Sequence, residues 1–200
     1  MDDPSRSELG LKFLAWLDGA GFDVVVWDMD CTMSAGHCGP GLPNAKLDEY
    51  IDATSPDFVT AVRAIASTGG RVRLAVATGS DPKEYELEGQ SRDTHVLGPD
   101  LASAVITRHC PEALPLFEIM VGFDCRLHVE QGAVAGASVE DKRHHMRLIQ
   151  SHYQVPFSRM LLIDDSPSSL VNEDGWLGVR VEGRRGFLFD HCWTTEAPHP

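Results

Sequence analysis

The chain has 200 residues, a length that suits one folded domain, and its 42% hydrophobic and 24% charged residues are ordinary for a globular protein. Thirty acidic residues against 17 Lys and Arg give a net charge of −13, which argues against a nucleic-acid surface because phosphate backbones attract clustered cations. No run of about 18 apolar residues occurs, so we expect no membrane span.

Cysteine usage and the N-terminus indicate the compartment. The five cysteines are scattered and form no CxxC pair, which is typical of a reducing environment rather than of a disulfide framework. The chain starts with a polar segment that lacks the apolar core of a secretion signal. We therefore expect a cytoplasmic protein. As a separate expectation, we take it to be a monomer or a weak homodimer.

The first half of the chain alternates helical and strand patterns. Phe13 and Leu17 fall on one face of an amphipathic segment, and Ser55 followed by Pro56 is typical of a helix start. In chain order we predict a helix over 7–18, a strand over 23–28, a Gly- and Pro-rich loop over 33–46, a helix from Ser55 to Gly69 and a strand over 72–77.

The second half continues the alternation. Residues 81–98 are polar and predicted to be irregular or weakly helical, and residues 123–138 are predicted as a surface insertion that could hold a hairpin. We further predict short helices over 99–108 and 111–117, strands over 119–121, 160–163 and 179–181, a helix from a capping segment at Ser138–Asp141 to Tyr153, a helix starting at Ser166–Pro167, and a loose tail over 194–200.

This alternation predicts an α/β fold, a Rossmann-like three-layer domain with a mostly parallel sheet. No repeat, low-complexity tract or linker is visible, so we expect a single domain over 1–200 with its core at about 7–182.

Polar residues follow three of the predicted strands. Asp28 and Asp30 come after the first, Thr78 ends the second, and the Asp164–Asp165 pair ends the fourth. In open α/β sheets ligands bind beyond the carboxyl ends of the strands, so these side chains converge if the strands are neighbours. Lys142, in the first turn of the predicted helix before the acidic strand, would add a cation. Carboxylates and a hydroxyl favour Mg²⁺, whereas zinc prefers His or Cys.

These motifs, in this order, resemble those of the haloacid-dehalogenase-like (HAD) hydrolase superfamily. The pattern runs from Asp28-Met29-Asp30-Cys31-Thr32 through Thr78 and Lys142 to Asp164-Asp165, and spans residues 24–172. The segments 141–146 and 155–165 look most like the capless magnesium-dependent phosphatase branch. About 45 residues separate Thr32 from Thr78, which leaves no room for a separate cap domain.

The resemblance implies roles for the two residues that act on the phosphate ester. Asp28 is the nucleophile that forms an aspartyl-phosphate, and Asp30 is the general acid and then the base for the hydrolytic water. Such a phosphoric monoester hydrolase would act on a phosphorylated small molecule or on a phosphoprotein side chain.

The remaining motif residues have supporting roles in this resemblance. Lys142 neutralises the reacting charges, while Thr78 and Gly79 bind phosphoryl oxygens and Thr32 positions Asp30 or the adjoining turn beside the substrate. The metal ligands are Asp28, the main-chain carbonyl of Asp30, Asp164 and Asp165.

Several alternatives stay open from the residues alone. Arg143 is the rival of Lys142, and Asp165 could cap the following helix instead of binding metal. Cys31, His37 and Cys38 invite a zinc interpretation, but no second half of such a site is evident.

The reaction itself also has alternatives. A phosphotransferase or phosphomutase would use the same intermediate, and a non-catalytic phospho-binding protein would retain its phosphate. The residues after Thr32 depart from the phosphatase pattern, because Met33 and Ser34 stand where a Leu and an aromatic are common. Together with the added segments 87–98 and 123–138, this departure leaves the substrate open.

Overall fold

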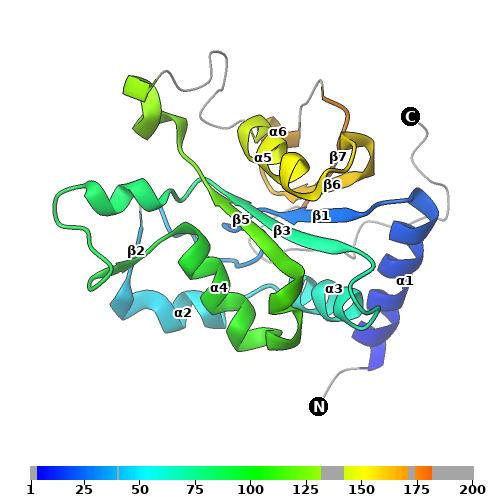
Figure 1. The fold of residues 1–200 in the computed structure, drawn as a ribbon. Helices are drawn as coiled ribbons and strands as arrows, with labels where there is room; N and C mark the ends of the chain where they lie inside the picture. The colour runs from blue at the N-terminus through cyan, green and yellow to red at the C-terminus, as the bar shows by residue number, and fades with distance from the viewer. Residues whose placement is uncertain (1–3, 40, 132–141, 171–173, 182–200) are drawn as a thin grey trace.

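The computed structural model describes residues 4–39, 41–131, 142–170 and 174–181. Its centre is a five-stranded sheet with the strand order β5-β3-β1-β6-β7, in which every neighbouring pair is parallel (Figure 1). The strands are β1 (Val24–Trp27), β3 (Arg73–Thr78), β5 (Phe117–Gly122), β6 (Met160–Asp164) and β7 (Leu177–Arg180). The predicted α/β fold with a parallel sheet is confirmed.

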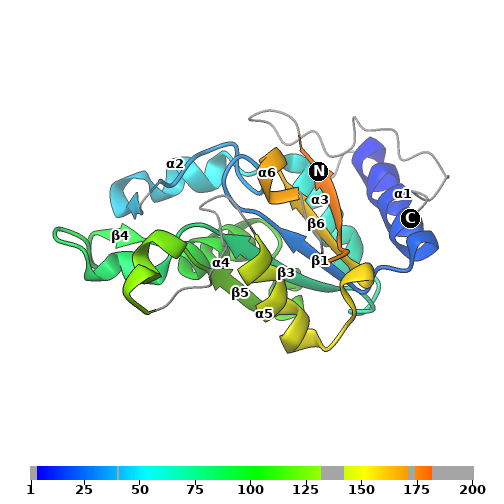
Figure 2. The same ribbon diagram turned by 90° about the horizontal axis from the view of Figure 1, so that it is seen from above.

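Helices cover both faces of this sheet and make three layers (Figures 1 and 2). In Figure 1, α3 and α4 lie below the sheet, and α5 and α6 lie above it. The longer helices are α1 (Pro4–Ala20), α3 (Pro56–Ala66), α4 (Gly98–His109) and α5 (Arg143–Tyr153), and the shorter ones are α2 (Leu47–Asp52) and α6 (Pro167–Leu170). There are also short 3-10 segments: η1 (Asn44–Lys46), η2 (Pro82–Glu86), η3 (Pro111–Leu116), η4 (Cys125–Gln131) and η5 (Phe157–Arg159).

The apolar run of β1 is continuous because both of its faces are buried. Side chains alternate along a strand, so Val25 and Trp27 point to one layer while Val24 and Val26 point to the other. Trp27 meets Phe58 of α3 edge to face, with ring centroids 5.0 Å apart. The opposite side of β1 belongs to a second apolar cluster that includes Met146 and Ile149 of α5. These two cores fix β1 in the middle of the molecule.

The predicted start of α3 is confirmed in detail. Ser55 is its N-cap, and the side-chain oxygen accepts a hydrogen bond from Phe58 N at 3.4 Å. Pro56 occupies the first helical position, where a missing N–H costs nothing.

Two segments that were predicted separately pair with each other. β2 (Leu42–Pro43) lies in the predicted loop 33–46, and β4 (His95–Val96) lies in the added segment 87–98. They form a small antiparallel sheet in which Leu42 pairs with Val96. Neither strand has a sequence pattern of its own, because pairing across some fifty residues depends on the tertiary fold.

The stretch before α5 differs from the prediction. Residues 125–131 form the 3-10 segment η4 rather than a strand of a hairpin, and residues 132–138 lie outside the described part of the chain. The predicted capping residues Ser138–Asp141 and the tail 194–200 also lie outside it. α5 begins at Arg143, so Lys142 precedes the helix at its N-cap instead of lying in the first turn. Within the described ranges, no helix combines the length and apolarity that crossing a bilayer requires.

Candidate active site

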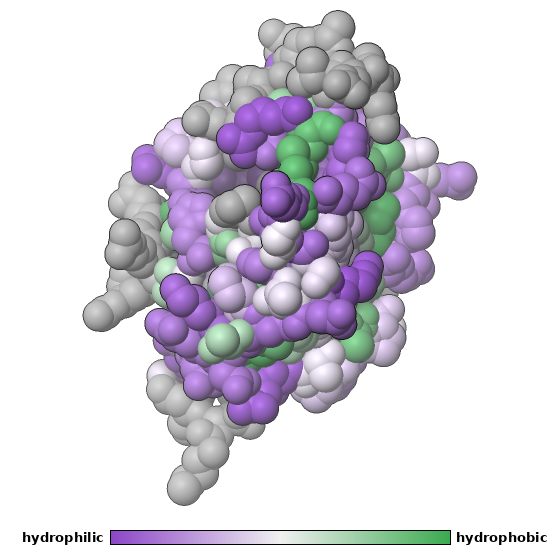
Figure 3. Space-filling model, turned by 90° about the vertical axis from the view of Figure 1, so that its left-hand side faces the viewer, coloured by the Kyte–Doolittle hydropathy of each residue, from purple (hydrophilic) through white to green (hydrophobic). Residues whose placement is uncertain are grey.

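The predicted site residues meet at one edge of the sheet. β3, β1 and β6 are adjacent and parallel, so the residues at their carboxyl ends, Thr78, Asp28 and Asp164, come together. All three line one cavity of about 770 Å³, together with Asp30 and Lys142. Figure 3 shows the side of the molecule on which η4 follows the end of β5. This side is mainly hydrophilic, with a few apolar patches.

Lys142, at the N-cap of α5, extends into the site from the helical layer above the sheet in Figure 1. Its side chain is buried, with 8% of the residue exposed. The ammonium group donates to Asp28 Oδ1 and to the main-chain oxygen of Ala77, each at 2.6 Å, and lies 3.8 Å from Asp164 Oδ2. Arg143, the alternative cation, does not line the cavity. Lys142 is therefore the cation that the fold directs at the acidic residues.

Burial dominates the electrostatics of this group. It raises the pKa of Asp28 to about 7, with Lys142 opposing the shift and Asp164 adding to it. Burial also raises the pKa of Asp164, again against the lowering effect of Lys142. For Lys142, burial acts to lower the pKa, but the attraction of Asp28 and Asp164 outweighs it and the pKa is raised. The site thus carries more negative charge than its one ammonium can compensate.

A group of three carboxylates can hold a divalent cation. Oxygens of Asp28, Asp164 and Asp165 all lie within 4.8 Å of one another. Asp164 Oδ1 accepts a hydrogen bond from Ser166 N at 2.8 Å, whereas Asp164 Oδ2 is buried without a hydrogen-bond partner among the described residues. A buried carboxylate oxygen in that state fits a metal ligand, and an all-oxygen set fits Mg²⁺. Where the structure is described, no Cys- or His-containing group of this kind occurs, so the zinc interpretation gains no support.

Asp30 lies in a different set of contacts from the three clustered carboxylates. Its carboxylate accepts hydrogen bonds from the Tyr50 hydroxyl at 2.8 Å, from Cys38 N at 3.0 Å and from Cys38 Sγ at 3.2 Å. His37 Nδ1 lies 2.6 Å from it as well. Tyr50 is buried, and a Cβ on Gly36 would come within 2.8 Å of its ring, so the glycine permits this packing. The loop and α2 therefore hold Asp30 in the lining of the cavity.

The residues predicted to bind the substrate divide into two groups. Thr78 and Gly79 line the cavity, and Thr78 Oγ1 accepts a hydrogen bond from Ser80 N at 3.1 Å, which shapes the turn after β3. Thr32 is buried in the turn that follows Asp30 and does not line the cavity. The predicted part of Thr32 in substrate binding, by positioning Asp30 or the adjoining turn, stays a prediction.

Further residues line the cavity beside the predicted site residues. They are Glu84 of η2, the segment 123–127 of the predicted insertion 123–138, His145 of α5 and Ser169 of α6. Of these, Glu84 and Ser169 were not predicted. One signal was available in the sequence: Asp81-Pro82 with Glu84 is a capping pattern, and Asp81 and Glu84 form a reciprocal capping box. His145 is buried, with Nε2 2.9 Å from the main-chain oxygen of Thr78. Burial and the nearby ammonium of Lys142 lower the pKa of His145 to about 3.

Comparison with known proteins supports the fold. No protein-family model matches the chain, and no curated protein matches it. Among solved structures, the chain is similar to the N-terminal part of a Bacteroides fragilis protein that contains a phosphatase domain and was crystallised with Mg. The TM-score is 0.51 at 14% sequence identity, and the match covers 94% of this chain and 43% of that one. The chain spans less than half the length of this neighbour, and at this identity the likeness shows a shared fold.

Proposed function

We propose that the protein is a Mg²⁺-dependent phosphatase of the haloacid-dehalogenase-like hydrolase superfamily, of the type without a separate cap domain. The observation that carries the proposal is that Asp28 and Asp164 stand at the carboxyl ends of neighbouring parallel strands, with the ammonium of Lys142, at the N-cap of α5, 2.6 Å from the first and 3.8 Å from the second. The order of these residues along the chain matches the superfamily motifs. The structural neighbour, which contains a phosphatase domain, adds support at the level of the fold.

In the first chemical step, a carboxylate oxygen of Asp28 attacks phosphorus and the bond to the leaving oxygen breaks. Asp30 donates a proton to that leaving oxygen, and the product is an aspartyl-phosphate plus an alcohol. In the second step, Asp30 takes a proton from a water molecule that attacks the same phosphorus, which releases phosphate and regenerates Asp28. Covalent catalysis divides a very slow hydrolysis into two easier steps.

Charge compensation comes from both sides of Asp28. The ammonium of Lys142 donates a hydrogen bond to Asp28 Oδ1, and its charge offsets the repulsion between this carboxylate and an anionic phosphate ester. Asp28, Asp164 and Asp165 would hold Mg²⁺, which when bound withdraws charge from the phosphoryl oxygens. Thr78 and the N–H of Gly79 would bind the remaining phosphoryl oxygens.

Two treatments test this proposal together. With Mg²⁺ present, the protein should hydrolyse a generic aryl phosphate over many turnovers, stop on chelation with EDTA, and recover when Mg²⁺ is restored. Asp28→Asn should abolish turnover while circular dichroism shows a retained fold. The proposal would be refuted by activity that is unchanged by the chelator. It would also be refuted by an Asp28→Asn protein that retains more than a few percent of the activity.

The same assay separates the alternative functions. A phosphotransferase would form a new phosphate ester when an acceptor alcohol is added. A phospho-binding protein would release at most one equivalent of product per chain.

A further inference from the structure

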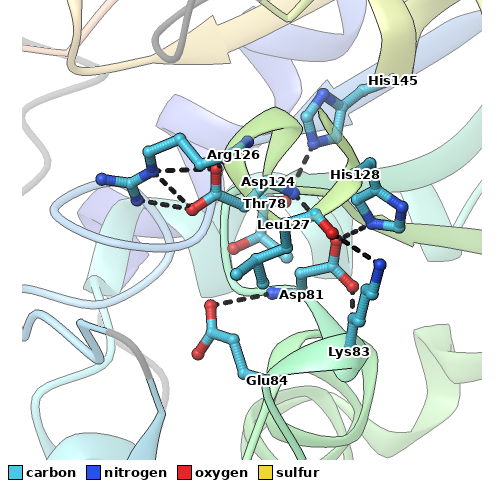
Figure 4. Close-up of polar contacts among 9 residues, drawn as sticks. All are labelled: Thr78, Asp81, Lys83, Glu84, Asp124, Arg126, Leu127, His128 and His145. Atoms are coloured by element: carbon cyan, nitrogen blue, oxygen red, sulfur yellow. Dashed lines mark hydrogen bonds and ion pairs between the residues drawn. The ribbon is translucent and has the colours of Figure 1, made fainter. Parts of the chain in front are cut away.

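One side of the cavity is a hydrogen-bonded wall, which we call the outer wall and define as residues 81–84, 87 and 123–128. Asp81 Oδ2 accepts a hydrogen bond from Asp124 N at 3.0 Å and lies 2.6 Å from His128 Nε2. The ammonium of Lys83 donates to the main-chain oxygen of Leu127 at 2.5 Å (Figure 4). Because these bonds join η2 to η4, the wall presents a fixed set of groups to the cavity.

Two of the three carboxylates of the outer wall are used within the wall itself. Asp81 accepts from Lys83 N at 2.8 Å, in addition to the two contacts that join the segments. Asp124 receives the side chain of Arg126 in a forked arrangement, with Nε 2.9 Å from Oδ2 and 3.0 Å from Oδ1 (Figure 4). Arg126 is therefore paired with Asp124. Because Asp81 and Asp124 both have hydrogen-bond partners within the wall, neither needs a ligand.

Glu84 is the third carboxylate, and it differs from the other two. The residue is 4% exposed and lines the cavity. Oε1 accepts a hydrogen bond from Asp81 N at 3.4 Å, but Oε2 is buried and has no hydrogen-bond partner among the described residues. Buried carboxylate oxygens are rarely left without a partner, because removing charge from water is costly. Burial raises the pKa of Glu84, and the negative charges of Asp124 and Asp81 add to the shift.

The surroundings of Glu84 indicate which ligand it suits. Asp81 and Asp124 act on Glu84 as negative charges and Arg126, which is paired with Asp124, acts as a positive one. An ammonium group would give the carboxylate a charge-assisted hydrogen bond at Oε2, the oxygen without a partner among the described residues. Leu87, Phe123 and Leu127 line the same cavity and offer an apolar surface to a short hydrocarbon chain. Asp28, the proposed nucleophile, lines the same cavity.

We propose that Glu84 binds an ammonium group on the organic part of the substrate, so that the enzyme prefers phosphate monoesters of aliphatic amino alcohols. This inference rests on the proposed function, which places the phosphoryl group at Asp28. The methylene chain would lie along the apolar side chains of the outer wall, and the ammonium would donate to Glu84 Oε2. The preference is a matter of binding and orientation, and adds no step to the reaction.

A matched series of substrates tests the preference. We would measure kcat/KM with Mg²⁺ for ω-aminoalkyl phosphates of increasing chain length, and compare each with the alkyl and ω-hydroxyalkyl phosphates of equal length. A charge-assisted hydrogen bond predicts that the amine exceeds the alkyl compound by about tenfold or more at one chain length. The hydroxyl compound should fall well below the amine.

Three variants assign the preference to Glu84. Glu84→Gln keeps the size and an oxygen for Asp81 N but removes the charge, so the ratio between amine and alkyl substrates should approach one. Glu84→Asp keeps the charge on a shorter side chain and should move the optimum to a longer substrate. The matched control is Glu86→Gln on the same 3-10 segment, because Glu86 is exposed and does not line the cavity. Its ratio should equal that of the wild type.

The outcomes are distinct from a failure of the proposed function. Absence of any aryl phosphate hydrolysis would overturn the proposed function, and this inference with it. Aryl phosphate hydrolysis without an amine preference at any chain length would overturn the inference alone. So would a hydroxyl substrate as good as the amine, or a preference that survives in Glu84→Gln. If Glu84→Gln does not fold, the chain-length optimum of the wild type and its displacement in Glu84→Asp decide the question.

Discussion

The Lys142 ammonium lies 2.6 Å from Asp28 Oδ1, although 114 residues separate the two in the chain. Asp28 directly follows the central strand β1, and Lys142 is the N-cap of α5, a helix that packs on one face of the sheet. The pair therefore exists only when β1 and α5 are docked, and it ties the chemistry of the site to the integrity of the core.

Replacing Lys142 by Met should lower kcat/KM for an aryl phosphate by about a hundredfold or more, since it removes the charge that faces the nucleophile. The variant should also unfold more readily, because Asp28 and Asp164 would remain buried with no ammonium between them. Steady-state kinetics and thermal melts measure the two effects. Lys142→Arg should retain more activity than Lys142→Met, and Lys12→Gln, at an exposed lysine of α1, should change neither quantity. Full activity of Lys142→Met would contradict the assignment.

The Tyr50 hydroxyl should matter most for substrates whose leaving group needs a proton. Tyr50→Phe removes the hydrogen bond to Asp30 Oδ1 and leaves the buried ring in place. We expect about a tenfold loss with an alkyl phosphate and little loss with a nitrophenyl phosphate, whose leaving group departs without acid assistance. Tyr85→Phe serves as the control. It removes a hydroxyl that accepts a hydrogen bond from Leu97 N, and Tyr85 does not line the cavity. Equal losses with both substrates would indicate a purely structural role.

His145 should make the protein less stable in mild acid. Its pKa is lowered to about 3 in the fold from an ordinary value of 6.5, first by burial and then by Lys142. The neutral ring therefore contributes stability that is fully present above pH 6.5 and is lost as pH falls from 6.5 toward 3. Between pH 7 and pH 5 this contribution amounts to at most about 2 kcal/mol.

Denaturant unfolding at these two pH values checks the sign. The wild type should lose more free energy of unfolding than His145→Gln between pH 7 and pH 5, while His152→Gln, at an exposed residue of the same helix, should behave like the wild type. A His145→Gln protein with the same pH dependence as the wild type would show that the ring is not buried in its neutral form.

The strands and the reacting residues could be predicted because they leave local signals. The run Val24–Val26 is apolar on both faces, and acids at its end have no packing role that would explain them. The pairing of Leu42 with Val96 leaves no such signal, since each strand is two residues long and each depends on the other.

The surroundings of the site were also beyond sequence reasoning. Tyr50 looks like an ordinary core residue in the sequence, and its contact with Asp30 follows from how α2 docks beside the loop. In the sequence Glu84 is part of a helix-capping pattern. Its place in the cavity lining depends on how η2 and η4 are joined through Asp81.

The central claim is that Asp28 becomes phosphorylated during turnover. The most direct measurement quenches the protein in acid during hydrolysis of an aryl phosphate with Mg²⁺ present, reduces it with borohydride, and locates the product by peptide mass. An aspartyl-phosphate would be converted to homoserine, and we predict this change at residue 28, dependent on both Mg²⁺ and substrate. Sustained turnover with residue 28 unmodified, or with the change at another residue, would contradict the account.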